Sequence, residues 1–227
     1  MLLNLLYLTY HCASPLPDHP EYLRGCLATR FNEYTLLHQH TNGNQFRYRY
    51  PLVQYRILND TAVIVGINEG AETLKEIYRK NPTLRIGATE FQVMEYDTCP
   101  RELEFGITDR PISYEFITPW LALNQENYTN YCALNSSERH EKLRRILVGN
   151  ILSAGKGLDY QIPGHVDLQI GEIRTEQCRL KSAPMIGFRC QFVTNFEIPD
   201  LLGLGKSVSR GFGAIRRLQP EKYQIEG

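Results

Sequence analysis

A stretch near the C-terminus places four glycines within eleven positions, at 203, 205, 211 and 213. Glycine accepts positive φ and allows a partner to approach the backbone closely, so such a loop can present rows of N–H groups. Cations and hydroxyls inside the loop would complement a phosphodiester backbone. We therefore predict a phosphate-binding loop, and the alternative is a flexible connector before a last strand. The predicted contacts are Gly203, Gly205, Lys206, Ser207, Ser209, Arg210 and Gly211.

The overall charge of the chain does not by itself indicate a polyanionic partner. Lys plus Arg and Asp plus Glu each number 25 in 227 residues. A nucleic-acid surface would therefore have to come from local clustering of cations. Hydrophobic residues make up 42% of the chain, which is sufficient for the packed core of one large domain or two small ones.

The cysteines and the N-terminus indicate a cytoplasmic protein without a membrane segment. The six cysteines contain no CxxC pair, so we expect reduced thiols rather than a zinc site or a disulfide framework. The apolar stretch Leu2–Tyr10 is too short to span a bilayer and lacks the features of a signal peptide. We predict that this stretch is the first strand.

The first hundred residues show the order β-α-β-β-α-β. Strands are expected at Leu2–Tyr10, Phe46–Tyr55, Thr61–Gly66 and Leu84–Tyr96. Asp18 is a candidate cap for a first helix, whose apolar face is formed by Leu23, Cys26, Leu27 and Phe31. Asn68 is a candidate cap for a second helix, whose buried face is formed by Ala71, Leu74 and Ile77 or Tyr78. This order is typical of a ferredoxin-like, or RRM-like, α+β domain.

The second half repeats this plan less clearly, with a boundary near Cys99–Pro111. We predict domains at 1–100 and 101–227, which makes the fold a tandem of ferredoxin-like domains. Strands are expected at Ile112–Ile117, His165–Leu180, Met185–Phe196 and Ala214–Leu218. Two helices are expected, with Asn124 and Asn135 as caps. The second helix is the longer, and its inward face is formed by Leu143, Ile146, Leu147 and Ile151.

One face of that longer helix carries a basic stripe. Arg139, Lys142 and Arg145 follow each other at a spacing of three residues. Such a stripe is usually a solvated surface, and the alternative is a contact with RNA.

Two histidines form a close pair, His38 and His40. In an extended segment, residues two apart point to the same side, so both imidazoles could share one site. Histidines that titrate near neutrality can act as general base and general acid. One would remove the proton from a 2′-hydroxyl that attacks the adjacent phosphate, and the other would protonate the departing 5′-oxygen. Such cleavage needs neither metal nor cofactor.

Two other interpretations of this pair stay open. The same spacing occurs in zinc sites, for which His11 is a conceivable third ligand, although no further partner is evident. The pair can also be ordinary polar residues at a loop entry. Nearby, Tyr48 could orient the attacking hydroxyl or stack on a base, or it could pack in the core. The chain contains no P-loop, Rossmann fingerprint or GxSxG elbow.

Residues 198–215, IPDLLGLGKSVSRGFGAI, resemble the glycine-rich signature of the RAMP superfamily of CRISPR-associated proteins. Three blocks in the first half of the chain resemble one group of that superfamily, the endoribonucleases that cut CRISPR repeat RNA. These blocks are YTLLHQH (34–40), YRYPLVQY (48–55) and INEGA (67–71). The similarity covers most of the chain, since the signature and these blocks together lie in both halves.

This resemblance implies tandem ferredoxin-like domains, metal-independent cleavage of precursor CRISPR RNA and retention of the mature guide. It matches His38 and His40 to the acid–base histidines, Tyr48 to an assisting tyrosine, and the glycine-rich stretch to an RNA-contacting loop. Other CRISPR effector subunits, or a second copy of the chain, are further partners it would allow. The main rival is a RAMP subunit that binds guide RNA without cutting it.

Overall fold

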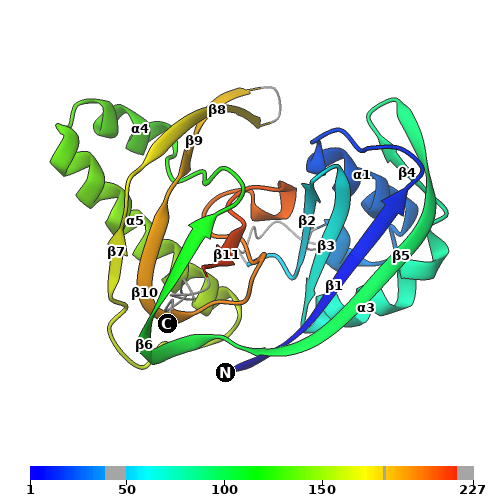
Figure 1. The fold of residues 1–227 in the computed structure, drawn as a ribbon, viewed down its shortest axis with the longest axis horizontal. Helices are drawn as coiled ribbons and strands as arrows, with labels where there is room; N and C mark the ends of the chain where they lie inside the picture. Colours follow the sequence, from blue (N-terminus) through cyan, green and yellow to red (C-terminus); the bar gives the residue numbers. More distant parts are fainter. Residues whose placement is uncertain (39–49, 181–182, 219–227) are drawn as a thin grey trace, which may run out of the picture.

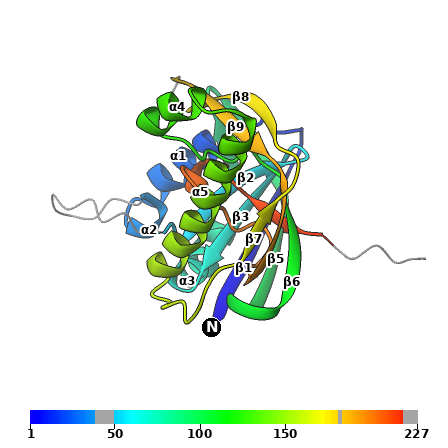
Figure 2. The same ribbon diagram turned by 90° about the vertical axis from the view of Figure 1, so that its left-hand side faces the viewer.

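The computed structural model describes residues 1–38, 50–180 and 183–218. The described residues form two larger antiparallel sheets, one from each half of the sequence, that lie side by side (Figure 1), and a third sheet of two strands. Figure 2 shows the helices gathered on one side of the two sheets. The opposite faces of the sheets are therefore the ones that the helices leave uncovered.

The N-terminal domain has a five-stranded sheet in the order β2-β3-β1-β5-β4, with every pair antiparallel. Alternate residues of β1 such as Leu6, Leu8 and Tyr10 are buried, as expected for a strand with one covered face. The elements are β1 (Leu2–Cys12), α1 (Pro20–Arg30), α2 (Thr35–His38), β2 (Val53–Leu58), β3 (Thr61–Ile67), α3 (Glu69–Ile77), the 3-10 turn η1 (Tyr78–Lys80), β4 (Thr83–Ile86) and β5 (Thr89–Glu104).

The helices of this domain agree with the sequence patterns, but their caps differ. Leu23 and Leu27 of α1 are buried, whereas the capping residue is His19 rather than Asp18, and Pro20 begins the helix. Proline suits this position because its missing N–H would have no partner in the first turn. Asn68 is the N-cap residue of α3 as predicted, although its side-chain oxygen accepts from the Asn4 N–H at 3.1 Å and not from the first turn of the helix.

Two strand predictions in this half were wrong in their bounds. The stretch Leu84–Tyr96 is the hairpin of β4 and β5, because Gly87 turns the chain with φ +64°. The strand expected at Phe46–Tyr55 begins only at Val53, since Pro51 has no N–H for a ladder. Residues 46–49 of that prediction lie outside the described residues.

The C-terminal domain has a four-stranded sheet in the order β11-β6-β10-β7, and a hairpin of β8 and β9 stands beside it. This order repeats β5-β1-β3-β2 of the first domain, with the glycine-rich stretch in the place of the second helix. The elements are β6 (Gly106–Phe116), α4 (Gln125–Cys132), α5 (Ser136–Gly157), β7 (Leu168–Ile170), β8 (Arg174–Leu180), β9 (Ala183–Arg189), β10 (Gln191–Glu197), the 3-10 turn η2 (Val208–Arg210) and β11 (Ile215–Arg217).

The tandem ferredoxin-like fold predicted from the sequence is confirmed by this repeated strand order. Both predicted helix caps of the second half are present as well. The Asn124 side chain accepts from the Asn127 N–H at 2.7 Å, and Asn135 forms a reciprocal capping box with Glu138. Leu143, Leu147 and Ile151 of α5 are buried, and Ile146 is partly buried.

The two long extended stretches predicted here are each divided. His165–Leu180 contains β7 and β8, which separate at Gly171, whose N–H donates to the Gln191 carbonyl. Met185–Phe196 contains β9 and β10, which separate at Cys190. The hairpin thereby leaves the four-stranded sheet. The closing strand is confirmed as β11, although it is shorter than Ala214–Leu218.

The domains share part of their hydrophobic core. Leu3, Leu5 and Val65 of the first domain belong to the same buried cluster as Phe196 and Leu202 of the second. All six cysteines are free thiols. Within the described ranges, every helix is too short or too polar to cross a membrane.

Candidate nucleic-acid interface

The glycine-rich loop is packed between the two domains. In Figure 1 its orange segment lies between the C-terminal sheet and β2. Gly211 is buried, and a Cβ atom there would stand 2.2 Å from the Pro20 ring of α1. On the other side, Gly205 lies against the Trp120 ring, where a Cβ would be 2.7 Å away. The glycines therefore allow close contact with both domains.

Much of the loop backbone is bonded inside the protein. The N–H groups of Gly203 and Leu204 donate to Gln54 Oε1 at 3.0 Å and to the Gly213 carbonyl at 2.9 Å. The N–H groups of Lys206, Arg210 and Gly213 also have internal carbonyl acceptors. Among the predicted contacts, the N–H groups of Gly203, Lys206 and Arg210 are therefore used by bonds inside the protein and are not presented to a phosphate. A contact with RNA at these positions would have to come from side chains.

The loop side chains differ in how far they reach the surface. Lys206, Ser207 and Arg210 are partly exposed, and the side chains of Lys206 and Arg210 have no hydrogen-bond or ion-pair partner among the described residues. Burial lowers the pKa of Lys206. Ser209 is only 5% exposed, and Gly203 is buried, so the structure does not favour direct RNA contact by these two.

A buried polar group that the sequence analysis missed fixes this loop to β2. Arg56 is fully buried, and its guanidinium donates to the carbonyls of Val208 at 2.5 Å and Leu201 at 3.3 Å. It also donates to Gln54 Oε1 at 2.7 Å, the same atom that accepts from the Gly203 N–H. The sequence signal is the pair of polar residues two apart in an otherwise apolar strand.

Tyr50 anchors the loop from the same side. Its hydroxyl donates to the Gly203 carbonyl at 2.8 Å, and its Cβ lies 2.4 Å from where a Cβ on Gly157 would be, at the end of α5. Burial raises the pKa of Tyr50 to about 12, so the phenol is a neutral donor. Tyr50 is therefore held between the end of α5 and the glycine-rich loop.

The predicted catalytic residues are described only in part. His38 is the last residue of α2, while His40 and Tyr48 lie outside the described residues. The helix α2 packs on α1 through the buried Leu37, and α1 also contacts η2 of the glycine-rich loop. Helix α2, which leads into the histidine pair, and the glycine-rich loop therefore both lie against α1.

Of the three histidines considered for a zinc site, only His11 has a described side chain. His11 is on β1, where its Nε2 lies 2.7 Å from Asp97 Oδ2. Within residues 1–38, 50–180 and 183–218, no group of three or more His, Cys, Asp or Glu side chains could hold a metal ion.

The basic stripe of α5 is partly engaged inside the protein. Arg139 donates to the carbonyls of Tyr131 and Cys132 at the end of α4, and Arg145 pairs with Glu141 at 2.7 Å. The bonds to Arg144 and Arg145 lower the pKa of Glu141 to about 2. Lys142 is partly exposed and has no such partner in the described residues. A contact with RNA by this stripe stays a prediction.

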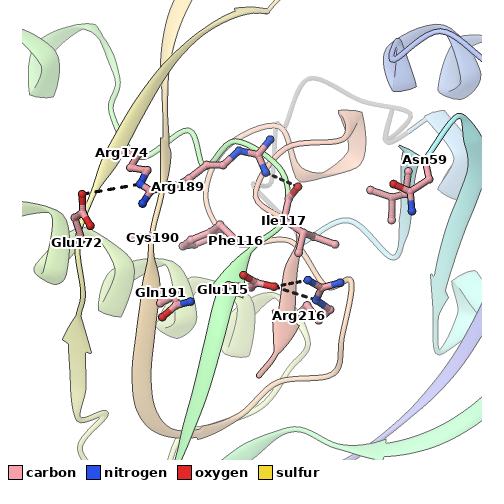
Figure 3. A pocket seen from close by; sticks show the side chains of 11 residues that line it. Asn59, Glu115, Phe116, Ile117, Glu172, Arg174, Arg189, Cys190, Gln191 and Arg216 are labelled. Atoms are coloured by element: carbon pink, nitrogen blue, oxygen red, sulfur yellow. Dashed lines mark hydrogen bonds and ion pairs between the residues drawn. The ribbon is translucent and has the colours of Figure 1, made fainter. Parts of the chain in front are cut away.

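A cavity of about 640 Å³ lies between the β2–β3 turn and the C-terminal sheet (Figure 3). Its three arginines each have a glutamate within 4.0 Å: Arg174 with Glu172, Arg189 with Glu176, and Arg216 with Glu115. Because these charges are balanced, the cavity has less local excess of positive charge than the loop.

Family models match the chain in both domains. A Cas6b N-terminal domain model matches residues 1–104, and a Cas6b C-terminal domain model matches residues 106–218. An uncharacterized protein of Methanocaldococcus jannaschii is 42% identical over 116 residues, which is 51% of this chain and 79% of that protein.

Solved structures extend the similarity over the whole fold. A crystal structure of Cas6b is 33% identical with a TM-score of 0.89, and covers 96% of this chain and 100% of its own. A CRISPR RNA processing endoribonuclease Cas6b is 30% identical with a TM-score of 0.77 at the same coverage. The type IV Cas6 crRNA endonuclease Csf5, at 14% identity and a TM-score of 0.60, shares the fold.

Two ferredoxin-like domains with a glycine-rich loop packed between them define a protein of the Cas6 class. The matches in both halves are more specific than this class. The chain belongs to the Cas6b family.

Proposed function

We propose that this protein is an endoribonuclease that cleaves CRISPR repeat RNA in precursor transcripts. The observation that carries the proposal is the match to both Cas6b domain models, in a chain whose structural relatives include a CRISPR RNA processing endoribonuclease. The contact of α1 with both α2 and η2 supports it, since it brings the approach to the histidine pair near the loop cations.

In the proposed reaction, His38 and His40 supply a general base and a general acid. The base takes the proton of a ribose 2′-hydroxyl, whose oxygen attacks the adjacent phosphorus. The bond from phosphorus to the 5′-oxygen breaks, and the acid protonates that oxygen. Tyr48 assists by donating to the phosphate, whose developing charge such a donor stabilises. The products are a 2′,3′-cyclic phosphate and a 5′-hydroxyl, and no metal ion takes part.

The proposed RNA path includes the side chains of Lys206, Ser207 and Arg210, since phosphate contacts position a nucleic acid without reading its sequence. These contacts would also let the protein retain the mature guide after cleavage. A RAMP subunit that binds RNA without cutting it would use the same surface, so binding alone does not separate the two functions.

A cleavage assay in EDTA with repeat RNA separates them. The proposed enzyme cuts the RNA at one site, the His40→Ala variant abolishes the cut and His38→Ala weakens it. Arg110→Ala is a matched control, because Arg110 is an exposed residue of β6 without an ion pair in the described residues. Tight binding of RNA that stays intact would favour the non-cutting subunit. Activity that EDTA removes would favour the zinc interpretation.

A further inference from the structure

The N-terminal helix α1 presents one face to the glycine-rich loop. Pro20 touches Gly211 there, at a distance that leaves no room for a side chain. Arg24 follows Pro20 by four residues, which places both on the same side of the helix. Arg24 is partly exposed, and Arg210 directly precedes Gly211. The loop thus brings an arginine of each domain to one junction.

The two arginines are close enough for their charges to act on each other. Burial and the positive charge of Arg210 lower the pKa of Arg24, while the nearby phenol of Tyr55 acts in the opposite direction. The side chain of Arg210 has no ion-pair or hydrogen-bond partner in the described part of the chain. Two guanidinium groups at one junction give it a local positive potential, which attracts an anion.

We propose that Arg24 and Arg210 bind the same RNA phosphate, so that the bound RNA bridges the two domains. Guanidinium groups suit this role because their planar donors match the oxygens of a phosphate. Arg24 is then an RNA-positioning residue supplied by the N-terminal domain, beside the helix α2 that ends at His38. This inference rests on the proposed function for the identity of the ligand as RNA.

The test is the salt dependence of binding to a labelled oligouridylate of about 20 nucleotides, since phosphate contacts do not depend on sequence. Each phosphate contact to a single strand contributes about 0.7 to the slope of log affinity against log salt. Arg24→Gln should reduce the slope by about 0.7. When salt is raised from about 50 to 200 mM, the affinity of this variant should therefore fall by a factor roughly 2.5 times smaller than the factor for the wild type. Arg24→Lys should keep most of the slope, because the charge remains.

A shared phosphate makes a further prediction. Arg210→Gln alone should lower the slope by the same amount, and the double variant should lower it little further, because both residues hold one phosphate. Arg110→Gln, at the exposed control position, should leave the slope unchanged. A wild-type slope in a folded Arg24→Gln variant would overturn the proposal. The proposal would also be overturned if Arg24→Gln and Arg24→Lys lost binding to the same extent and lowered the melting temperature to the same extent. That pattern would indicate a structural role for Arg24.

The proposed function is read separately, from cleavage of repeat RNA by the wild-type protein. If the wild type binds oligouridylate through Arg24 but leaves repeat RNA intact, the nuclease proposal fails and the phosphate site stands. If it cleaves repeat RNA and Arg24→Gln changes no slope, the phosphate site fails alone.

Discussion

Arg56 in β2 of the first domain donates a 2.5 Å hydrogen bond to the Val208 carbonyl in the glycine-rich loop of the second. Both residues are buried, and no carboxylate partner of Arg56 is present in the described residues. Burial lowers the pKa of Arg56 to about 10, so the group is charged at neutral pH. A buried cation held by main-chain and amide oxygens thus joins the domains at the candidate interface.

Removing this guanidinium should destabilise the protein. Arg56→Met leaves the carbonyls of Val208 and Leu201 without this donor inside the domain interface. The expected loss is about 2 to 3 kcal/mol in the free energy of unfolding, the cost of buried groups left unsatisfied. Denaturant unfolding measures it, with Arg101→Met at an exposed position of β5 as the control. A loss equal to that of the control would contradict the role of Arg56.

The glycines of the loop should not tolerate a methyl group. Gly213 has φ +69°, and a Cβ there would lie 2.0 Å from the Leu204 carbonyl oxygen. Gly213→Ala should cost about 3 kcal/mol, since both the backbone conformation and the space are unsuitable. The matched control is Gly149→Ala in α5, where nothing lies within 4 Å of the added atom. That change should add up to about 1 kcal/mol of stability. Equal effects in thermal melts would count against the packing described here.

Alkaline pH should unfold the protein through its buried phenols. Burial raises the pKa of Tyr114 to about 12, and its oxygen accepts from the Ile198 N–H at 2.9 Å. An unfolded tyrosine titrates near 10, so stability is complete below pH 10 and is lost as pH rises toward 12. Each such tyrosine contributes a slope of about 1.4 kcal/mol per pH unit in that window.

The variant Tyr114→Phe isolates this contribution. It should cost about 1 kcal/mol at neutral pH, because the Ile198 N–H loses its acceptor. Its stability should then fall less steeply than that of the wild type between pH 10 and 12. Parallel curves of unfolding free energy against pH would show that Tyr114 does not titrate in this way.

Lys206 should contribute to RNA binding through its charge. Its ammonium has no ion-pair partner in the described residues, and it lies in the glycine-rich loop. Lys206→Ala should weaken binding at every RNA sequence and lower the salt slope by about 0.7. Lys80→Ala, an exposed position in η1, is the control. Wild-type binding by Lys206→Ala across a salt series would remove this residue from the interface.

Local sequence patterns predicted much of the fold because their causes are local. Asn135 caps α5 through a residue three positions later, and the buried face of that helix follows from its period. The hairpin of β8 and β9 was not predicted, because the alternation of apolar and polar side chains along a strand does not determine which sheet the strand joins. Only the pairing of residues far apart decides this.

The site was less predictable for the same reason. The glycines were interpreted as a backbone open to phosphate, whereas Gly211 and Gly205 are in contact with Pro20 and Trp120. No feature of the loop sequence names these distant partners. Gln54 and Arg56 stand out as polar residues in an apolar strand, but no local feature shows that the glycine-rich loop of the other domain covers Arg56.

The measurement that tests the central claim most directly compares two repeat RNAs in EDTA. One is all-ribose, and the other carries a single 2′-deoxy nucleotide on the 5′ side of the mapped cut. The account predicts that both bind equally, that the ribose RNA is cut to a 2′,3′-cyclic phosphate and a 5′-hydroxyl, and that the deoxy RNA stays intact because it lacks the attacking hydroxyl. Cleavage of both RNAs, or of neither, would contradict it.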